Sequence, residues 1–401
     1  MLDSPVVARV TLGLAAALLL AVVAAHPRVR AWEERLGITV MFTSGLPFLL
    51  LGAFLAAGPV GVLSPAILGD LKPALEFGLG WMGFVVGTQL DVRRLDRLPA
   101  PASTLLGAQT FFPAALTAGV CAPLLLLLGA GPGDGLVRDV LLLAGCAVAT
   151  APVAVRLSGE SSAALDEVAA VDAVAALASL GAVSIFLRPD ALQTNWALPG
   201  SALLVLMLGL GAMLGVLAWL VLRAARDETE EAALLIGLVA LSAGLAAYLA
   251  LSGAVVCALA GAVLANLPLP DRRNFLKLLH EVERPLYLVF LVIVGATWRP
   301  FEVAGWLLAA AYVVGRVGGK WLATRVATRL EPSLPHPVSL ARALVPQGPV
   351  AILVMAAAAT LYGETAPRAV GWAVHAAIVG ALATDVLARA LRPHPPTRLA
   401  A

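Results

Sequence analysis

Apolar runs of about 20 residues recur along the whole chain and alternate with short polar segments. A helix of that length crosses the roughly 30 Å hydrocarbon core of a bilayer. The pattern therefore predicts an all-α polytopic membrane protein with about thirteen transmembrane helices. The predicted spans cover residues 6–25, 38–57, 73–90, 102–129, 137–156, 164–187, 199–222, 231–250, 252–268, 285–298, 302–327, 338–361 and 368–391.

The composition supports a membrane protein. Of the 401 residues, 60% are hydrophobic and 13% are charged, whereas soluble domains have roughly 45–50% and about 25%. The net charge of +2 offers little attraction for nucleic acid. The 3 cysteines and 5 histidines show no metal-ligand spacing, so we expect neither a resident metal nor a cofactor. No linker leads to a soluble regulatory domain, and we expect a single membrane domain.

Arginine and lysine predict the orientation of the chain. They gather in the loops after odd-numbered spans and in the C-terminal tail, and cytoplasmic loops carry such an excess. We therefore expect the N-terminus outside and the C-terminus in the cytoplasm, in the inner membrane of a bacterium. Residues 1–8 lack the positive charge of a secretory signal, so we retain the run at 6–25 as a span.

Charged side chains inside the apolar runs carry the strongest functional signal. Asp172, Arg316 and Lys320 lie well inside predicted spans, where a charge costs about 2.5–3.5 kcal/mol. At the helical rise, Asp172 and Lys320 lie about 12 Å and about 10 Å from the same predicted membrane edge. Arg316 precedes Lys320 by one turn on the same helix face. The pattern predicts a shared ion site, and a purely structural ion pair is the alternative.

Two predicted spans are interrupted at a matching depth. Proline removes a backbone donor and clashes with the preceding turn, and the freed groups must face protein or a water-lined cavity. Two such broken helices point to a transporter binding site, and ordinary proline kinks are the alternative. The residues at the interruptions are Thr150, Ala151 and Pro152 in one span and Pro346, Gln347, Gly348 and Pro349 in the other.

An ordered set of motifs runs over roughly residues 38–390. The motifs are GLPFLLLGAFLAAGPVGVL (45–63), ALEFGLGWMGFVVGTQLDVRRLDRL (74–98), ATAPVAV (149–155), VDAVAALASL (171–180), LALSGAVVCALAGAVLAN (249–266), RPLYLVFLVIVGATW (284–298), GRVGGKWLA (315–323) and LVPQGPVAILV (344–354). In this order, the set resembles the monovalent cation:proton antiporters.

The resemblance implies a fold of two inverted repeats with two broken crossing helices. Residues 102–187 and 302–391 would then form the ion-transporting core. Residues 1–98 and 231–298 would form a scaffold that dimerises, and 199–222 would be the helix that links the two parts.

The resemblance also implies roles for individual residues. Asp172 matches the carboxylate that binds the cation or the proton, Lys320 matches the basic residue of the core, and Thr150 matches the threonine of the first crossing helix. The chain departs from the polar residues that the family often carries at three positions, which are Ala151, Val171 and Pro349.

The expected function is exchange of protons for Na⁺ or K⁺ by a homodimer in the lipid bilayer. Because only one acid lies at the site, we expect one proton per cation and an electroneutral cycle. Two alternatives remain: a non-transporting membrane sensor or scaffold, and an organic-anion carrier that uses Lys320 and Arg316 as a clamp. The sequence shows no paired acids and no nucleophile beside a base, so we do not expect an enzyme.

Overall fold

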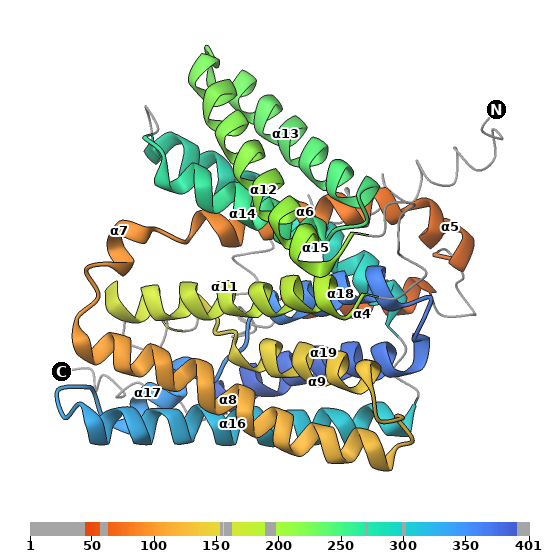
Figure 1. Cartoon of the computed structure of the whole chain (residues 1–401), viewed down its shortest axis with the longest axis vertical. Coiled ribbons are helices and arrows are strands. Elements are labelled where there is room, and N and C mark those ends of the chain that lie inside the picture. The colour runs from red at the N-terminus through yellow and green to blue at the C-terminus, as the bar shows by residue number, and fades with distance from the viewer. Residues whose placement is uncertain are drawn as a thin grey trace, which may run out of the picture.

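The structure is a computed structural model, and it describes residues 45–56, 63–152, 155, 163–188, 198–268, 272–298 and 302–390. The predicted span at 6–25 and the first part of the next span lie outside the described residues. Within the described ranges the chain forms helices joined by short connections and contains no strand, so the all-α prediction is confirmed (Figure 1).

The helices keep the labels of Figure 1. They are α4 (Leu46–Ala56), α5 (Pro65–Asp70), α6 (Lys72–Thr88), α7 (Val92–Leu95), α8 (Ala100–Leu127), α9 (Asp134–Val148), α11 (Ala163–Phe186), α12 (Gly200–Ala224), α13 (Glu228–Tyr248), α14 (Gly253–Asn266), α15 (Arg272–Thr297), α16 (Val303–Leu330), α17 (Pro337–Leu344), α18 (Pro349–Tyr362) and α19 (Pro367–Ala390).

Several helices have the length and apolar composition of a membrane span. They are α8, α12 and α13 along their whole length, α11 from Ala164, and α19 as far as Leu387. Helices α17 and α18 meet at a bend of 43° and together form a broken span. The protein is therefore an integral membrane protein, and the total of about thirteen spans stays a prediction.

The helices pack in two groups. In one, α14 packs along both α6 and α12, and α15 packs along α4; in the other, α16 lies between α8 and α19, with α9 beside α8 (Figure 1). Helices α11 and α18 contact both groups. The close approach of α6 and α14 depends on glycine, since a Cβ on Gly87 would lie 1.9 Å from the carbonyl oxygen of Ala258.

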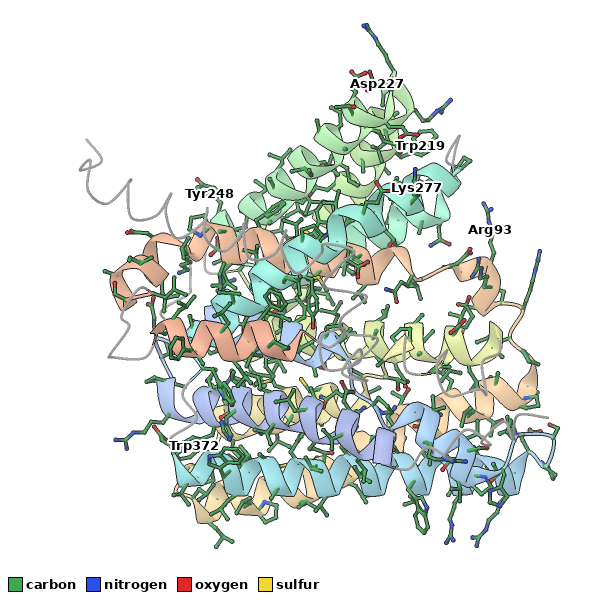
Figure 2. All side chains as sticks on the ribbon, turned by 180° about the vertical axis from the view of Figure 1, so that it is seen from behind. Arg93, Trp219, Asp227, Tyr248, Lys277 and Trp372 are labelled. Atoms are coloured by element: carbon green, nitrogen blue, oxygen red, sulfur yellow. The ribbon has the colours of Figure 1, made fainter. Side chains whose placement is uncertain are left out.

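The described helices have their ends toward two opposite sides of the molecule (Figure 2). Seen from behind, Arg93 and Lys277 lie toward one end, and Tyr248 and Trp372 lie toward the other (Figure 2). Arg93 and Lys277 belong to predicted loops on the same side of the membrane. The buried acid and base that the sequence singled out, Asp172 and Lys320, lie between these ends, where the interrupted helices meet.

Helix α15 is longer than the predicted span at 285–298, because it begins at Arg272. Its first half is amphipathic: Phe275 and Leu279 are buried, whereas Lys277 and Glu281 are exposed. A hydropathy pattern scores such a charged segment as a loop, although helical spacing supports a helix. Pro285 lies inside this helix without ending it, so proline alone does not break a span here.

Candidate functional site

The two interruptions touch each other at the centre of the structure. Helix α9 ends at Val148 and helix α17 at Leu344, and the Ala151 N–H donates a 2.9 Å hydrogen bond to the Pro346 carbonyl. Gly348 has φ +71°, and a Cβ there would lie 2.9 Å from that of Ala151. A residue with a side chain would be strained and crowded at this point, so the contact between the breaks requires glycine.

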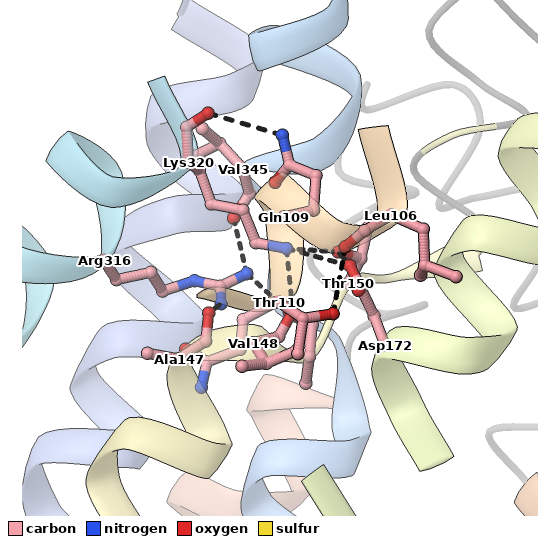
Figure 3. A network of polar contacts seen from close by, with 12 residues as sticks. Leu106, Gln109, Thr110, Ala147, Val148, Thr150, Asp172, Arg316, Lys320 and Val345 are labelled. Carbon is pink, nitrogen blue, oxygen red and sulfur yellow. Dashed lines mark hydrogen bonds and ion pairs between the residues drawn. The ribbon is translucent and has the colours of Figure 1, made fainter. Parts of the chain in front are cut away.

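Asp172 lies buried on α11 and faces the first break (Figure 3). Its Oδ2 atom accepts a 2.5 Å hydrogen bond from the Thr150 hydroxyl and a 2.9 Å bond from the Lys320 ammonium. Thr150 and Lys320 are also fully buried. The acid, the hydroxyl and the base that the sequence singled out therefore meet at one point.

The Lys320 ammonium group has a hydrogen-bond acceptor for each of its N–H donors. Besides Asp172, its Nζ donates to the Val148 carbonyl at 2.7 Å and to the Thr150 hydroxyl oxygen at 2.9 Å. An ammonium has three N–H donors and no acceptor, so these contacts fit the charged form of lysine. The ion pair is held by matched hydrogen bonds, which a buried pair needs to offset its desolvation.

The second carboxylate oxygen of Asp172, Oδ1, lacks the hydrogen bonds that Oδ2 accepts. Oδ1 is buried and has no hydrogen-bond partner among the described residues. A buried carboxylate oxygen without a donor is costly for a purely structural ion pair. It is, however, a ready oxygen ligand for a cation or an acceptor for a proton.

Arg316 lies one turn from Lys320 and is also fully buried. Its guanidinium donates to the carbonyls of Ala147, Ala149 (2.7 Å) and Val345 (2.9 Å) (Figure 3). These carbonyls lie at the ends of α9 and α17, where the peptide dipoles concentrate negative charge and the last carbonyls lack helical partners. Arg316 therefore fastens the two breaks to α16, and within the described residues its bonds go to these carbonyls instead of to Asp172.

Further polar residues support the crossing. Gln347, at the second break, donates to the Cys146 carbonyl at 3.1 Å and to the Tyr312 hydroxyl. Gln109 on α8 donates to the carbonyl of Lys320 at 3.4 Å. Tyr312 and Gln109 were not predicted from the sequence as part of the site. A glutamine inside an apolar span could have indicated Gln109.

The remaining predicted residues take different places. Pro349 is the first residue of α18, and Pro152 follows the first break directly, so both flank the site without supplying a side-chain donor. Arg342, a further charged residue near the start of the predicted span 338–361, lies half-buried on α17, where its Nε donates to the Val338 carbonyl at 3.4 Å. Val171 is half-buried on α11 beside Asp172.

A model of the transmembrane sodium/hydrogen exchanger family matches residues 46–389. The chain belongs to the sodium/hydrogen exchanger family. The exchanger also shares its fold with the sodium proton antiporter MjNhaP1 from Methanocaldococcus jannaschii. The structure of that antiporter at pH 8 matches with a TM-score of 0.65 and 16% identity, over 96% of each chain.

A second structure of MjNhaP1, an electron-microscopy map, matches with a TM-score of 0.61 and 14% identity, over 92% of this exchanger and 93% of that chain. No curated protein sequence matches the exchanger. At these identities the structural likeness establishes the fold, and the family establishes that the protein is a membrane transporter of the cation:proton exchange class and not an enzyme.

Proposed function

We propose that this exchanger moves Na⁺ or K⁺ against protons by alternating access, with Asp172 as the residue that binds each in turn. The observation that supports this most directly is the contact of Asp172 with Thr150 and Lys320 beside two broken helices. A carboxylate suits exchange because its protonated form has lost the charge that holds a cation. Backbone carbonyls at the breaks and the Thr150 hydroxyl supply the further oxygens that a hard cation requires.

Lys320 competes with the cation for Asp172. The ammonium and a bound cation would both approach the same carboxylate, so cation entry requires the Nζ to move away from Oδ2. Oδ1 offers the first contact, since it has no donor among the described residues. When the cation leaves, Lys320 returns and the buried carboxylate is again paired.

The charges at the site support an electroneutral cycle in which one proton exchanges for one cation. Asp172 is the acid that faces the breaks, and a single carboxylate exchanges one proton for one monovalent cation. If Lys320 keeps its charge, the site carries the same total charge with either substrate. The membrane potential then does no work on the moving part of the protein.

Alternating access would follow from movement of one helix group against the other. We propose that residues 102–187 and 302–391 move with the site, that the helices within 1–98 and 231–298 form the fixed scaffold and dimerise, and that 199–222 link them. The packing of α16 against α8 and α19, and of α14 against α6, supports this division. The arginine-rich loops support a cytoplasmic C-terminus in a bacterial inner membrane.

The two rival functions fit the geometry less well. An anion clamp needs both cations to face the anion, but Lys320 spends its three donors on Val148, Thr150 and Asp172, and the terminal nitrogens of Arg316 donate to backbone carbonyls. A scaffold gains nothing from a buried acid with an unpaired oxygen, which apolar residues would replace at lower cost.

The test uses purified protein in liposomes with an imposed pH gradient and an internal pH-sensitive dye. We expect addition of NaCl or KCl to dissipate the gradient with the natural protein and with Asp166→Asn, a control acid in the first turn of the same helix. We expect Asp172→Asn to abolish this response, and a normal response would refute the proposal. A rate that changes when the membrane potential is clamped at different values would refute the electroneutral part.

A further inference from the structure

A cavity with polar side chains on part of its wall lies away from the Asp172 site, at the end of the molecule where Tyr248 is seen in Figure 2. It has a volume of about 100 Å³ and lies between α6, the turn that joins α13 to α14, and α18. Glu76 from α6, Ser252 from the turn and Thr360 from α18 line it. The cavity therefore lies where α18, which contacts both helix groups, meets the group that contains α6 and α14.

Ser252 is the residue that indicates a ligand. It directly precedes α14, where a serine usually caps the helix with its hydroxyl, but its side chain makes no such bond. The residue is only 2% exposed, and its Oγ has no partner among the described residues. A buried hydroxyl without a hydrogen bond costs free energy, and because Ser252 is one of the residues that line the cavity, a ligand bound there could supply the missing partner.

The other groups on the wall complete an oxygen-rich set. The Thr360 hydroxyl donates its hydrogen to the Ala357 carbonyl at 2.8 Å, which leaves its oxygen lone pairs for another contact. Glu76 is half-buried and adds a carboxylate. One carboxylate and two hydroxyls suit a hard cation, and a single negative charge suits a monovalent one.

Lys72 also lines the cavity, one helical turn from Glu76 and exposed at its rim. The cavity thus repeats the chemistry of the Asp172 site, which likewise combines a carboxylate, a hydroxyl and a lysine. The ammonium of Lys72 makes no salt bridge with Glu76 among the described residues, so it leaves the carboxylate open to a cation. This arrangement permits binding that is weak and readily reversed.

We propose that Glu76, Ser252 and Thr360 form a loading site for the transported monovalent cation. The inference rests on the proposed exchange function for the identity of the ion. The charge distribution of the loops assigns this end to the outer face, so the site would serve the cation that enters from outside. Because α6 and α18 both contribute, its geometry changes when the two helix groups move against each other.

Cation binding is tested first without transport, in the Asp172→Asn background. The melting temperature of the purified protein is measured in NaCl, in KCl and in choline chloride at equal ionic strength. We expect Na⁺ or K⁺ to raise the melting temperature above the choline value in Asp172→Asn. The rise should disappear when Glu76→Gln or Ser252→Ala is added. No rise in Asp172→Asn, or a rise that persists in both double variants, overturns the proposal.

Transport in liposomes gives the second test. We expect Glu76→Gln to raise the half-saturating cation concentration about tenfold when the cation is added at the outer face, with the maximal rate unchanged. Glu364 is an exposed acid that follows α18 at the same end. Its replacement, Glu364→Gln, serves as the control and should leave the half-saturating cation concentration unchanged. If Glu76→Gln and Glu364→Gln have the same half-saturating cation concentration, the loading role is refuted. If the natural protein exchanges no cation, the proposed function fails, while the melting experiment still decides whether this cavity binds one.

Discussion

Replacement of Arg316 by methionine should lower the melting temperature of the protein. Methionine is apolar and ends short of the position of the guanidinium, so it cannot donate to the carbonyls of Ala147, Ala149 and Val345. Those acceptors lie at the ends of α9 and α17, and they are buried where water cannot replace the guanidinium. The two breaks therefore lose the group that fastens them to α16.

The magnitude follows from these three hydrogen bonds. Hydrogen bonds between membrane helices average about 0.6 kcal/mol in double-mutant cycles, which gives about 2 kcal/mol in total. Bonds to a charged group reach about 1.5 kcal/mol or more, which gives about 5 kcal/mol. At roughly 2 °C per kcal/mol for a chain of this size, the melting temperature should fall by about 4–10 °C.

The assay is thermal unfolding of purified protein in detergent, with Arg325→Met as a matched control. Arg325 lies on the same helix and stacks over the Trp321 ring at 3.9 Å instead of binding the breaks, so its loss should shift the melting temperature little. Arg316→Lys should fall between the two, because a point-like ammonium cannot reach carbonyls on two helices as a planar fork does. Equal melting temperatures for Arg316→Met and Arg325→Met would refute this reasoning.

Three further predictions concern the site and the helix packing. Thr150→Val removes the hydroxyl between the acid and the base and should weaken cation affinity about tenfold in a binding titration, while Thr150→Ser restores it. Gly87→Ala forces α6 away from α14 and should lower the melting temperature, whereas Gly107→Ala, which meets no atom within 4 Å, should not. Ala250→Gly should raise the melting temperature, equivalent to about 1 kcal/mol, because Ala250 has φ +51° and glycine adopts that conformation without strain; an unchanged value would count against strain in this turn.

Much of the helical framework follows from local sequence. Apolar length predicts where α8, α11 and α12 run, because a helix satisfies its own backbone within lipid. The local sequence pattern predicts less reliably whether a proline interrupts a helix. Pro113 lies inside a continuous α8, whereas the Pro346 region breaks the helix between α17 and α18. The difference depends on the neighbours: the second break meets a matching break in another helix and a guanidinium that binds the freed carbonyls.

The sequence by itself determined that Asp172 and Lys320 are special, because a charge inside an apolar helix is costly wherever that helix packs. Only the tertiary structure decided what each charge binds. Asp172 and Lys320 are 148 residues apart and meet through the packing of α11, α9 and α16. The same packing directs Arg316 to backbone carbonyls and brings Ser252 into one cavity with residues of distant helices. Burial cost is a property of one helix, whereas hydrogen-bond partners are a property of how helices pack together.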